Sequence, residues 1–319
     1  MRILVVGAGA TGGYFGGRLL EAGRDVTFLV RPQRAASLAK RGLAIRSPLG
    51  DFRIPAPPTV TDDRLAAPFD LVILSCKAYD LDGAVASLAK AVGPQTAILP
   101  LLNGMRHLDV LAGRFGADRP LGGVCVISAT RDADGDIVHL NDLHSLTFGE
   151  LSGDRSARIE AIASTLSGAG FEARFSDKIR QEMWEKWIFI ANAAGITCLM
   201  RAAIGDIVAA GAANLATDLL DECAAVAAAE GFPPRSPFLA GIRKTLTAPG
   251  SLMTASMLRD IKTGARVEAE AILGDLLRRA ARPDEPSLLR VAYAHVKAYE
   301  ARRERGLPGF SPSTGAAPG

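Results

Sequence analysis

Short apolar runs alternate with longer amphipathic segments along residues 1–102. Four of the runs are rich in Val, Ile and Leu and are too short for helices, which is typical of buried parallel strands. These strands are expected at residues 3–6, 25–30, 70–75 and 96–102. Helices are expected between them, at residues 14–22, 35–41 and 80–92. Strands that alternate with helices predict a doubly wound α/β domain with a mostly parallel sheet.

The helical segments disappear in two stretches, where antiparallel strands are expected. Residues 43–57 alternate around a turn at residues 48–51 and predict a small hairpin. Beyond residue 122, apolar strands follow one another with polar turns and no long helix between them, so part of the sheet is expected to be antiparallel. The strands are expected at residues 124–129, 137–140 and 145–148, followed by a helix at 159–167 and a strand at 171–175.

A second domain is expected to begin after residue 176, where the pattern becomes almost entirely helical and rich in Ala, Leu, Glu and Arg. We therefore predict an α/β domain over residues 1–176 and an all-helical domain over residues 177–305. Residues 306–319 are rich in Pro, Gly and Ser, so a disordered tail is expected there.

Composition narrows the class of protein. Of the 319 residues, 48% are hydrophobic and 22% are charged, so two domains can each bury a core. A formal net charge of +3 is too small to indicate nucleic-acid binding. No apolar run is long enough to span a bilayer and no signal peptide is recognised, which predicts a cytoplasmic protein without a membrane partner. Four cysteines without a C-x-x-C pair and four scattered histidines predict reduced thiols and no metal site.

Three glycines with the spacing G-x-G-x-x-G follow the first strand: Gly7, Gly9 and Gly12. In a dinucleotide-binding turn the first makes the tight turn, the second lets the pyrophosphate approach the backbone, and the third lets the helix pack closely. The amide groups at the helix start would then bind the phosphate. The spacing alone is weak evidence, and a tight turn without a ligand is the alternative. The strand before it and the helix after it favour a dinucleotide.

The residue after the second strand indicates which dinucleotide is bound. An NAD site usually carries Asp or Glu there for the ribose 2′-hydroxyl, whereas Arg31 stands here, with Arg34 three residues later. A guanidinium pairs well with a 2′-phosphate, so NADP is favoured over NAD. The alternative is that both arginines only form a solvated loop surface.

Four candidate residues are expected at one edge of the parallel sheet. Gly7, Arg31, Lys77 and Asn103 each follow the carboxyl end of a predicted strand. Ligands of doubly wound sheets bind beyond these ends. Their convergence predicts that the cofactor lies at this edge.

Reduction by a nicotinamide also needs a proton donor for the new alkoxide. Lys186 is the candidate, because it adjoins the apolar run 187–191 on a predicted helix, and partial burial can lower the pKa of a lysine. The alternative is a surface lysine paired with Glu182 or Glu185.

Ser256 and Glu268 form a second pair of candidates, twelve residues apart. On a straight helix this distance is a little over three turns, and a bend or break near Gly264 would let both side chains reach one pocket. A hydroxyl and a carboxylate on a solvated helix face are the alternative.

Several sequence blocks, in this order and spacing, resemble the ketopantoate reductases (2-dehydropantoate 2-reductases) over about residues 1–305. The blocks are GAGATGG after the first strand, Arg31, Ser75-Cys76-Lys77-Ala78, Leu102-Asn103-Gly104-Met105, Met183-Trp184-Glu185-Lys186 and Ser256-Met257-Leu258-Arg259-Asp260-Ile261. The resemblance implies a Rossmann domain followed by a helical domain. It also implies NADPH-dependent reduction of a small 2-oxo acid in pantothenate biosynthesis, and a surface for homodimer formation.

The resemblance implies roles for individual residues. Lys186 would polarise the ketone and protonate the alkoxide, and Ser256 would contact the substrate carboxylate. Asn103 would lie near the nicotinamide and the substrate, and Glu268 would orient substrate or cofactor at the reacting centre as a second catalytic residue. The residues implied to bind NADP(H) are Gly7, Gly9, Ala10, Thr11, Gly12, Arg31, Lys77, Asn103 and Glu268.

Two positions depart from the family pattern. Members of the family usually carry asparagines four and eight residues after the lysine, on about the same helix face, where they contact polar substrate groups. Ile190 and Ala194 stand there, while Asn192 points about 240° around the helix from Lys186. A buried hydroxyl facing Ile190 would lack a partner, at a cost of about 1–3 kcal/mol. An NADP-dependent dehydrogenase for a less polar 2-oxo or 2-hydroxy acid, or a non-catalytic redox sensor, is therefore the alternative.

Overall fold

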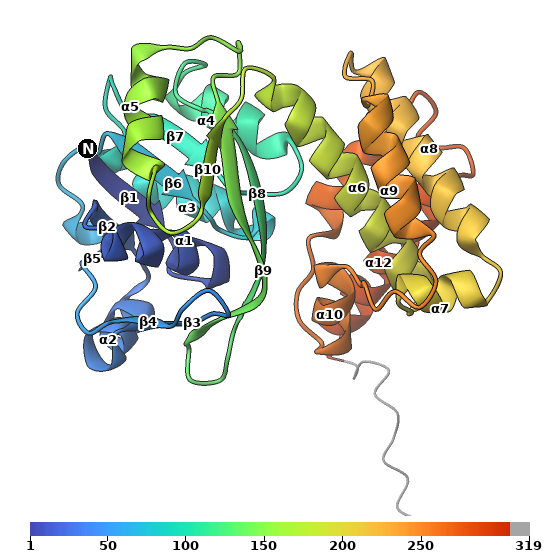
Figure 1. Cartoon of the computed structure of the whole chain (residues 1–319), viewed down its shortest axis with the longest axis horizontal. Helices are drawn as coiled ribbons and strands as arrows, with labels where there is room; N and C mark the ends of the chain where they lie inside the picture. Colours follow the sequence, from blue (N-terminus) through green and yellow to red (C-terminus); the bar gives the residue numbers. More distant parts are fainter. Residues whose placement is uncertain (307–319) are drawn as a thin grey trace, which may run out of the picture. The chain divides into compact units, whose positions relative to one another are not determined.

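The computed structural model describes residues 1–306 and divides into two compact units, Met1–Met183 and a second that begins at Trp184 (Figure 1). The division falls inside a long helix that starts shortly after the boundary expected from the sequence. Apart from Gly306, the predicted tail lies outside the described residues. In the part of the chain that the structure covers, no helix is both long and apolar enough to cross a membrane.

Unit 1 contains a five-stranded parallel sheet. Its strands are β1 (Arg2–Val6), β2 (Asp25–Leu29), β5 (Thr59–Val60), β6 (Leu71–Leu74) and β7 (Ala97–Pro100), in the order β5-β2-β1-β6-β7. Val6 pairs with Leu29 and with Leu74, so three strands end side by side. The strand order reverses between β1 and β6, which is where doubly wound sheets bind their ligands. The predicted α/β fold is therefore confirmed.

Five helices and three short turns lie between the strands of unit 1. They are α1 (Ala10–Glu21), α2 (Pro32–Arg41), α3 (Leu81–Leu88), α4 (Arg106–Phe115) and α5 (Ala157–Leu166), with short 3-10 turns η1 (Asp62–Arg64), η2 (Ala78–Asp80) and η3 (Ala89–Ala91). The sequence analysis did not predict α4, and it placed the start of α1 at Tyr14. The helix begins earlier because its first turn holds Gly12 and Gly13, which pack closely but contribute no apolar periodicity.

The antiparallel strands belong to a second, mixed sheet that was not expected to be separate. Its strands are β3 (Leu43–Arg46), β4 (Phe52–Ile54), β8 (Gly122–Arg131), β9 (Ile137–Gly149) and β10 (Glu172–Phe175). The order is β10-β9-β3-β4, with β8 antiparallel to β9, and β3 and β4 form the predicted hairpin. The two strands predicted at 137–140 and 145–148 are a single strand, because pairing with β8 continues across the polar residues between them. Those residues form a bulge, with Ile127 opposite His144 and Ala129 opposite His139.

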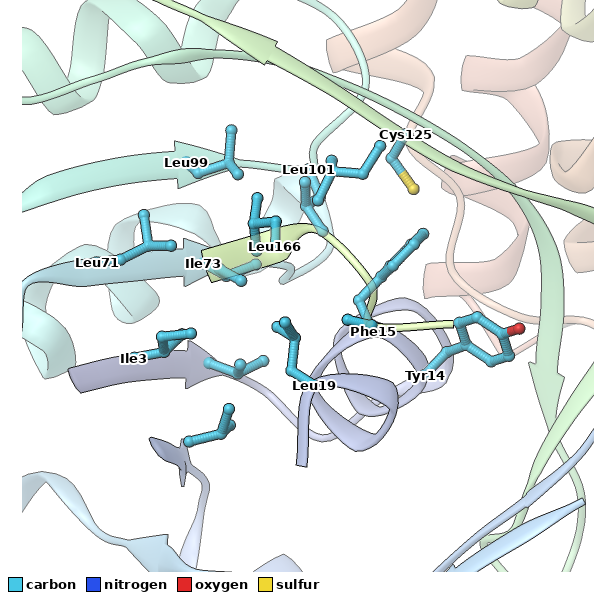
Figure 2. Packing of buried hydrophobic residues seen from close by; sticks show 14 of the residues in the cluster. Ile3, Tyr14, Phe15, Leu19, Leu71, Ile73, Leu99, Leu101, Cys125 and Leu166 are labelled. Carbon is cyan, nitrogen blue, oxygen red and sulfur yellow. The ribbon is translucent and has the colours of Figure 1, made fainter. Parts of the chain in front are cut away.

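Helix α1 packs against both sheets through glycines. A Cβ at Gly16 would lie 2.6 Å from Cε1 of Phe28 in the first sheet, and one at Gly13 would lie 2.5 Å from Cδ1 of Ile137 in the second. The same helix fills the core with its large side chains. Figure 2 shows this buried cluster, with the labelled side chains Ile3, Phe15, Leu19, Ile73 and Leu166. Helix α1, whose first turn contains the last glycine of the motif, is therefore held tightly in place.

Every regular element that the structure describes in unit 2 is a helix, which confirms the predicted helical C-terminal half. The elements are α6 (Ile179–Met200, beginning in unit 1), α7 (Ile204–Ala209), α8 (Ala213–Ala229), α9 (Ser236–Leu246), α10 (Ser256–Lys262), η4 (Glu270–Gly274, a π-helix), α11 (Asp275–Arg278) and α12 (Leu288–Glu304). Helix α6 is deeply packed, with residues 191–198 all buried. Such a helix gives a firm base for any side chain it carries.

Candidate active site

The glycine turn after β1 has the shape of an anion-binding site. Gly7 has a φ of 94°, a conformation that favours glycine, and its amide donates to the carbonyl of Leu29 over 2.9 Å. A Cβ at Gly9 would meet nothing within 4 Å, so the space in front of it is open. Ala10 and Thr11 begin α1 there and are half-buried. The amides and the positive end of the helix dipole can hold a diphosphate at this point.

Gly12 is required by packing beneath this turn. A Cβ there would lie 2.0 Å from Oγ of Ser75 and 2.4 Å from the carbonyl oxygen of Gly7. The Ser75 hydroxyl donates to the carbonyl of Val6 over 3.0 Å, which ties the ends of β6 and β1 together. In the sequence Ser75 stands out only as part of the block Ser75-Cys76-Lys77-Ala78, and this role was not predicted. No local pattern could have revealed it, because its partners are far away in the chain.

Arg31 lies just after β2 at the same edge of the sheet. Its side chain is 82% exposed, and Nη2 lies 3.2 Å from Oδ1 of Asp80. Asp80 belongs to the turn η2, where its amide donates to the carbonyl of Lys77 over 2.9 Å. The structure therefore brings Arg31 and the turn of Lys77 together. Arg34 does not take part in this contact: its Nη2 donates to the carbonyl of Gly135, in the turn between β8 and β9.

Asn103 completes the candidates of unit 1. It follows β7 in a turn where Gly104 has a φ of 78°, and it is half-buried. The preceding Leu101 amide donates to the carbonyl of Leu74 over 2.8 Å, so this turn leaves the sheet beside the end of β6. Asn103 thus lies at the carboxyl edge, as the sequence predicts for all four residues of this group.

Lys186 lies on α6 in unit 2 and is half-buried between two buried neighbours, Glu185 and Trp187. Glu185 forms an ion pair with Arg235, whose backbone amide and Nε each lie 2.9 Å from Oε1. Glu182, the other glutamate considered as a partner of Lys186, forms an ion pair with Arg174. Both glutamates therefore have arginine partners.

The helix face beyond Lys186 is apolar. Ile190 is half-buried one turn later, and Ala194 is buried. Asn192 is fully buried, and its Nδ2 donates to the carbonyl of Ala216 in α8 over 2.7 Å. The structure therefore directs Asn192 away from the lysine face, as helical geometry predicts.

Ser256 and Glu268 lie on separate elements. Ser256 is exposed at the start of α10, which ends at Lys262, and Gly264 follows with a φ of 70°. This is the predicted break. Glu268 is half-buried and lies two residues before the start of the π-helix η4.

The segments that carry Ser256 and Glu268 are hydrogen-bonded to different turns of α6. The amide of Ala255, just before Ser256, lies 3.4 Å from the hydroxyl oxygen of Thr197, about 16 Å along the helix from Lys186. On the other side, Nε1 of Trp187 donates to the carbonyl of Ile272 in η4 over 3.0 Å. The structure thus ties the segment of Glu268 to the helical turn of Lys186. This role of Trp187 was not predicted, although Trp187 directly follows the candidate lysine.

Residues 1–306 contain no group of three or more His, Cys, Asp or Glu side chains that could hold a metal ion. The four cysteines are free thiols. Burial raises the pKa of Cys198 to about 12, so this thiol stays protonated at neutral pH.

Comparison with known proteins gives matches over most of the chain. The family model described as "Ketopantoate reductase PanE/ApbA" matches residues 3–153, and that described as "Ketopantoate reductase PanE/ApbA C terminal" matches residues 178–300. The "Uncharacterized oxidoreductase YkpB" of Bacillus subtilis is 37% identical, over 95% of this chain and 100% of that protein. The 2-dehydropantoate 2-reductase of Halobacterium salinarum is 29% identical, over 88% of this chain and 92% of that protein. The crystal structure of 2-dehydropantoate 2-reductase from Geobacter metallireducens matches this one with a TM-score of 0.83. The match covers 93% of this chain and 99% of that chain, with 28% sequence identity.

Proposed function

The chain belongs to the ketopantoate reductase family and is an oxidoreductase, and from this premise we propose that it reduces a 2-oxo acid to a 2-hydroxy acid with NADPH. The reaction is of the 2-dehydropantoate 2-reductase type, which would place the chain in pantothenate biosynthesis. The observation that carries the proposal is Gly9. Its φ of −84° and the open space around it would accept any small residue, so the fold does not demand glycine there. Close approach of a diphosphate accounts for it.

The proposed chemistry divides between the two units. When bound, NADPH supplies a hydride to the carbonyl carbon of the substrate. The ammonium group of Lys186 polarises the carbonyl and donates a proton to its oxygen, so that the product carries a hydroxyl. The Ser256 hydroxyl donates to the substrate carboxylate, while Asn103 and Glu268 orient the reacting groups. Gly7, Gly9, Ala10, Thr11 and Gly12 form the diphosphate turn.

The preference for NADPH rests on Arg31, with Lys77 as a second cation at the same edge. The guanidinium of Arg31 is exposed and can pair with a 2′-phosphate in two parallel hydrogen bonds. Its contact with Asp80 is a solvent-exposed pair and therefore weak, so a phosphate can replace it. This supports NADP(H) over NAD(H) as the cofactor.

The first test compares the wild type with Lys186→Ala in an assay of NADPH consumption with ketopantoate. Loss of the proton donor is expected to lower kcat by about 10²- to 10⁴-fold. Affinity for NADPH should change little, because the diphosphate turn lies in unit 1. Lys244→Ala, which removes an exposed lysine of α9, serves as the matched control and should keep wild-type turnover. Near-normal turnover of Lys186→Ala would show that another group donates the proton.

A second candidate substrate is a 2-oxo acid with a less polar side chain. Ile190 and Ala194 make the face next to Lys186 apolar, and Asn192 is occupied by its bond to α8. Such a face favours an aliphatic group over a hydroxyl, which would lack a partner there. Assays of ketopantoate and of plain aliphatic 2-oxo acids, in both reaction directions, distinguish the candidates. Tight NADPH binding without turnover of any acid would identify a non-catalytic redox sensor.

Two further proposals concern the setting of the reaction. Free thiols at all four cysteines fit a reducing compartment, which supports a cytoplasmic location. Homodimer formation, implied by the family resemblance, stays a prediction that sedimentation equilibrium can test.

A further inference from the structure

A chain of two buried hydrogen bonds joins the helix of Lys186 to the segment of Glu268. The indole Nε1 of Trp187 donates to the carbonyl of Ile272 over 3.0 Å. The amide of Ile272 in turn donates to the carbonyl of Glu268 over 3.1 Å. Trp187 is 1% exposed and Ile272 is 3% exposed, so water does not compete for these groups. Buried bonds of this kind hold their partners in one arrangement.

The acceptor lies in an unusual piece of backbone. Ile272 is the middle residue of the π-helix η4, which begins two residues after Glu268. π-Helices are rare single turns that often occur at functional sites. The hydroxyl of Tyr293 in α12 donates to Oε2 of Glu270 over 2.7 Å, on a second side of this turn. A Cβ at Gly274 would lie 2.8 Å from Cε2 of Tyr293, so the turn has little room to shift.

We propose that Trp187 is a positioning residue, which sets the place of Glu268 relative to Lys186 through the carbonyl of Ile272. The inference rests on the proposed function, in which Lys186 donates the proton and Glu268 orients the reactants. Trp187 directly follows Lys186. One turn of α6 therefore carries both the proton donor, Lys186, and the indole that holds the segment of Glu268. A displacement of about 1 Å at a reacting group can cost about 10²-fold in rate.

The substitution Trp187→Phe tests this link, because it keeps an aromatic ring in the core and removes the N–H. We expect kcat to fall by about 10- to 100-fold while the Kd for NADPH stays near the wild-type value. Asn192→Leu is the matched control. Asn192 is as deeply buried in α6 as Trp187, and its Nδ2 donates to the carbonyl of Ala216 in α8 over 2.7 Å, on a helix face away from Lys186. Its replacement should reduce stability to a similar extent and leave kcat near that of the wild type.

A double-mutant cycle with Glu268→Gln separates positioning from general support of the fold. If Trp187 acts through Glu268, the double variant loses clearly less activity than the product of the two single losses. Multiplying losses would overturn the positioning role and leave the proposed reaction intact. Wild-type activity of Glu268→Gln would instead remove Glu268 from the proposed site, and the positioning role with it.

A second variant keeps the test decisive if Trp187→Phe does not fold. Gly274→Ala introduces a steric clash between the same π-helix and the ring of Tyr293, and it changes no residue of α6. It is expected to lower kcat and to show the same coupling to Glu268→Gln. A folded Gly274→Ala protein with wild-type kcat would contradict the inference.

Discussion

At the residue scale, alanine at Gly9 and at Gly12 separates binding of a ligand from packing of the fold. A methyl group at Gly12 would collide with backbone at the carbonyl of Gly7, which cannot give way, so Gly12→Ala should lower the free energy of unfolding by about 1–3 kcal/mol or more. Gly9→Ala meets nothing within 4 Å and should leave stability unchanged while weakening NADPH binding. Urea unfolding and fluorescence titration with NADPH measure the two effects. Equal effects of Gly9→Ala and Gly12→Ala on stability would contradict this distinction.

Arg31 offers a second prediction at this scale, with the two cofactors serving as internal controls. Arg31→Ala should raise KM for NADPH by about 10- to 100-fold, which corresponds to the roughly 1.5–3 kcal/mol of a hydrogen bond to a charged group. KM for NADH should change little, because NADH has no 2′-phosphate. Steady-state kinetics with both cofactors measure the ratio. If Arg31→Ala raises KM by the same factor for NADPH and for NADH, Arg31 does not recognise the 2′-phosphate.

Single residues of the candidate site were predictable where they belong to a local pattern. Gly7, Arg31 and Asn103 follow strands whose ends the apolar runs mark, and the structure places all three at the carboxyl edge. Ser75 and Trp187 were missed, because their hydrogen bonds go to residues distant in the sequence. A hydroxyl or an indole gives no sign in the sequence of which distant carbonyl it will meet.

At the element scale, Glu150 links the end of β9 to the start of α5. Its carboxylate accepts from Nε of Arg158 over 2.7 Å and from the hydroxyl of Ser156, the N-cap of α5. Burial by itself would raise the pKa of Glu150, but these hydrogen bonds hold the pKa below its usual value of 4.5. In the unfolded chain the carboxylate therefore takes up its proton at a higher pH than in the folded chain. The stabilisation is complete above the unfolded value and is lost as pH falls through the folded one.

The lowered pKa of Glu150 leads to a prediction for Glu150→Gln. The variant should be less stable than the wild type by about 2 kcal/mol at neutral pH, because it loses charge-assisted hydrogen bonds. The difference should begin to shrink below about pH 4.5, where the carboxylate of the unfolded wild type takes up its proton, and should be lost as pH falls through the lower pKa of the folded state. Urea unfolding at a series of pH values measures it, with Glu160→Gln as an exposed control that should show a smaller effect. A difference that does not depend on pH would contradict the assignment.

Elements were predicted well where the pattern is regular and poorly where glycine or long-range pairing decides. Four strands of the first sheet, β1, β2, β6 and β7, have apolar runs, and their positions agree with the prediction to within a few residues, whereas the two-residue strand β5 was not predicted. Helix α1 was placed too late, because Gly12 and Gly13 carry no apolar signal. Strand β9 was divided in two, because its polar bulge resembles a turn until its pairing with β8 is known.

At the scale of the whole molecule, two units carry different parts of the proposed reaction. Unit 1 carries the diphosphate turn and the cationic edge at Arg31, and unit 2 carries Lys186, Ser256 and Glu268. The change from alternating strands and helices to continuous helix marks this organisation in the sequence. It does not show that α1 packs against two separate sheets, because this depends on which strands pair.

The sequence by itself determined the α/β and helical halves, the glycine turn after β1 and the set of candidate residues. Apolar periodicity and glycine spacing are local properties, and they follow from the geometry of a strand or a helix. Only the tertiary structure decided that Ser75 lies under Gly12, that Glu185 pairs with Arg235, and that a π-helix joins the segment of Glu268 to Trp187. Each of these contacts joins residues far apart in the chain, and the local periodicity of a strand or a helix carries no signal of which distant residues will meet.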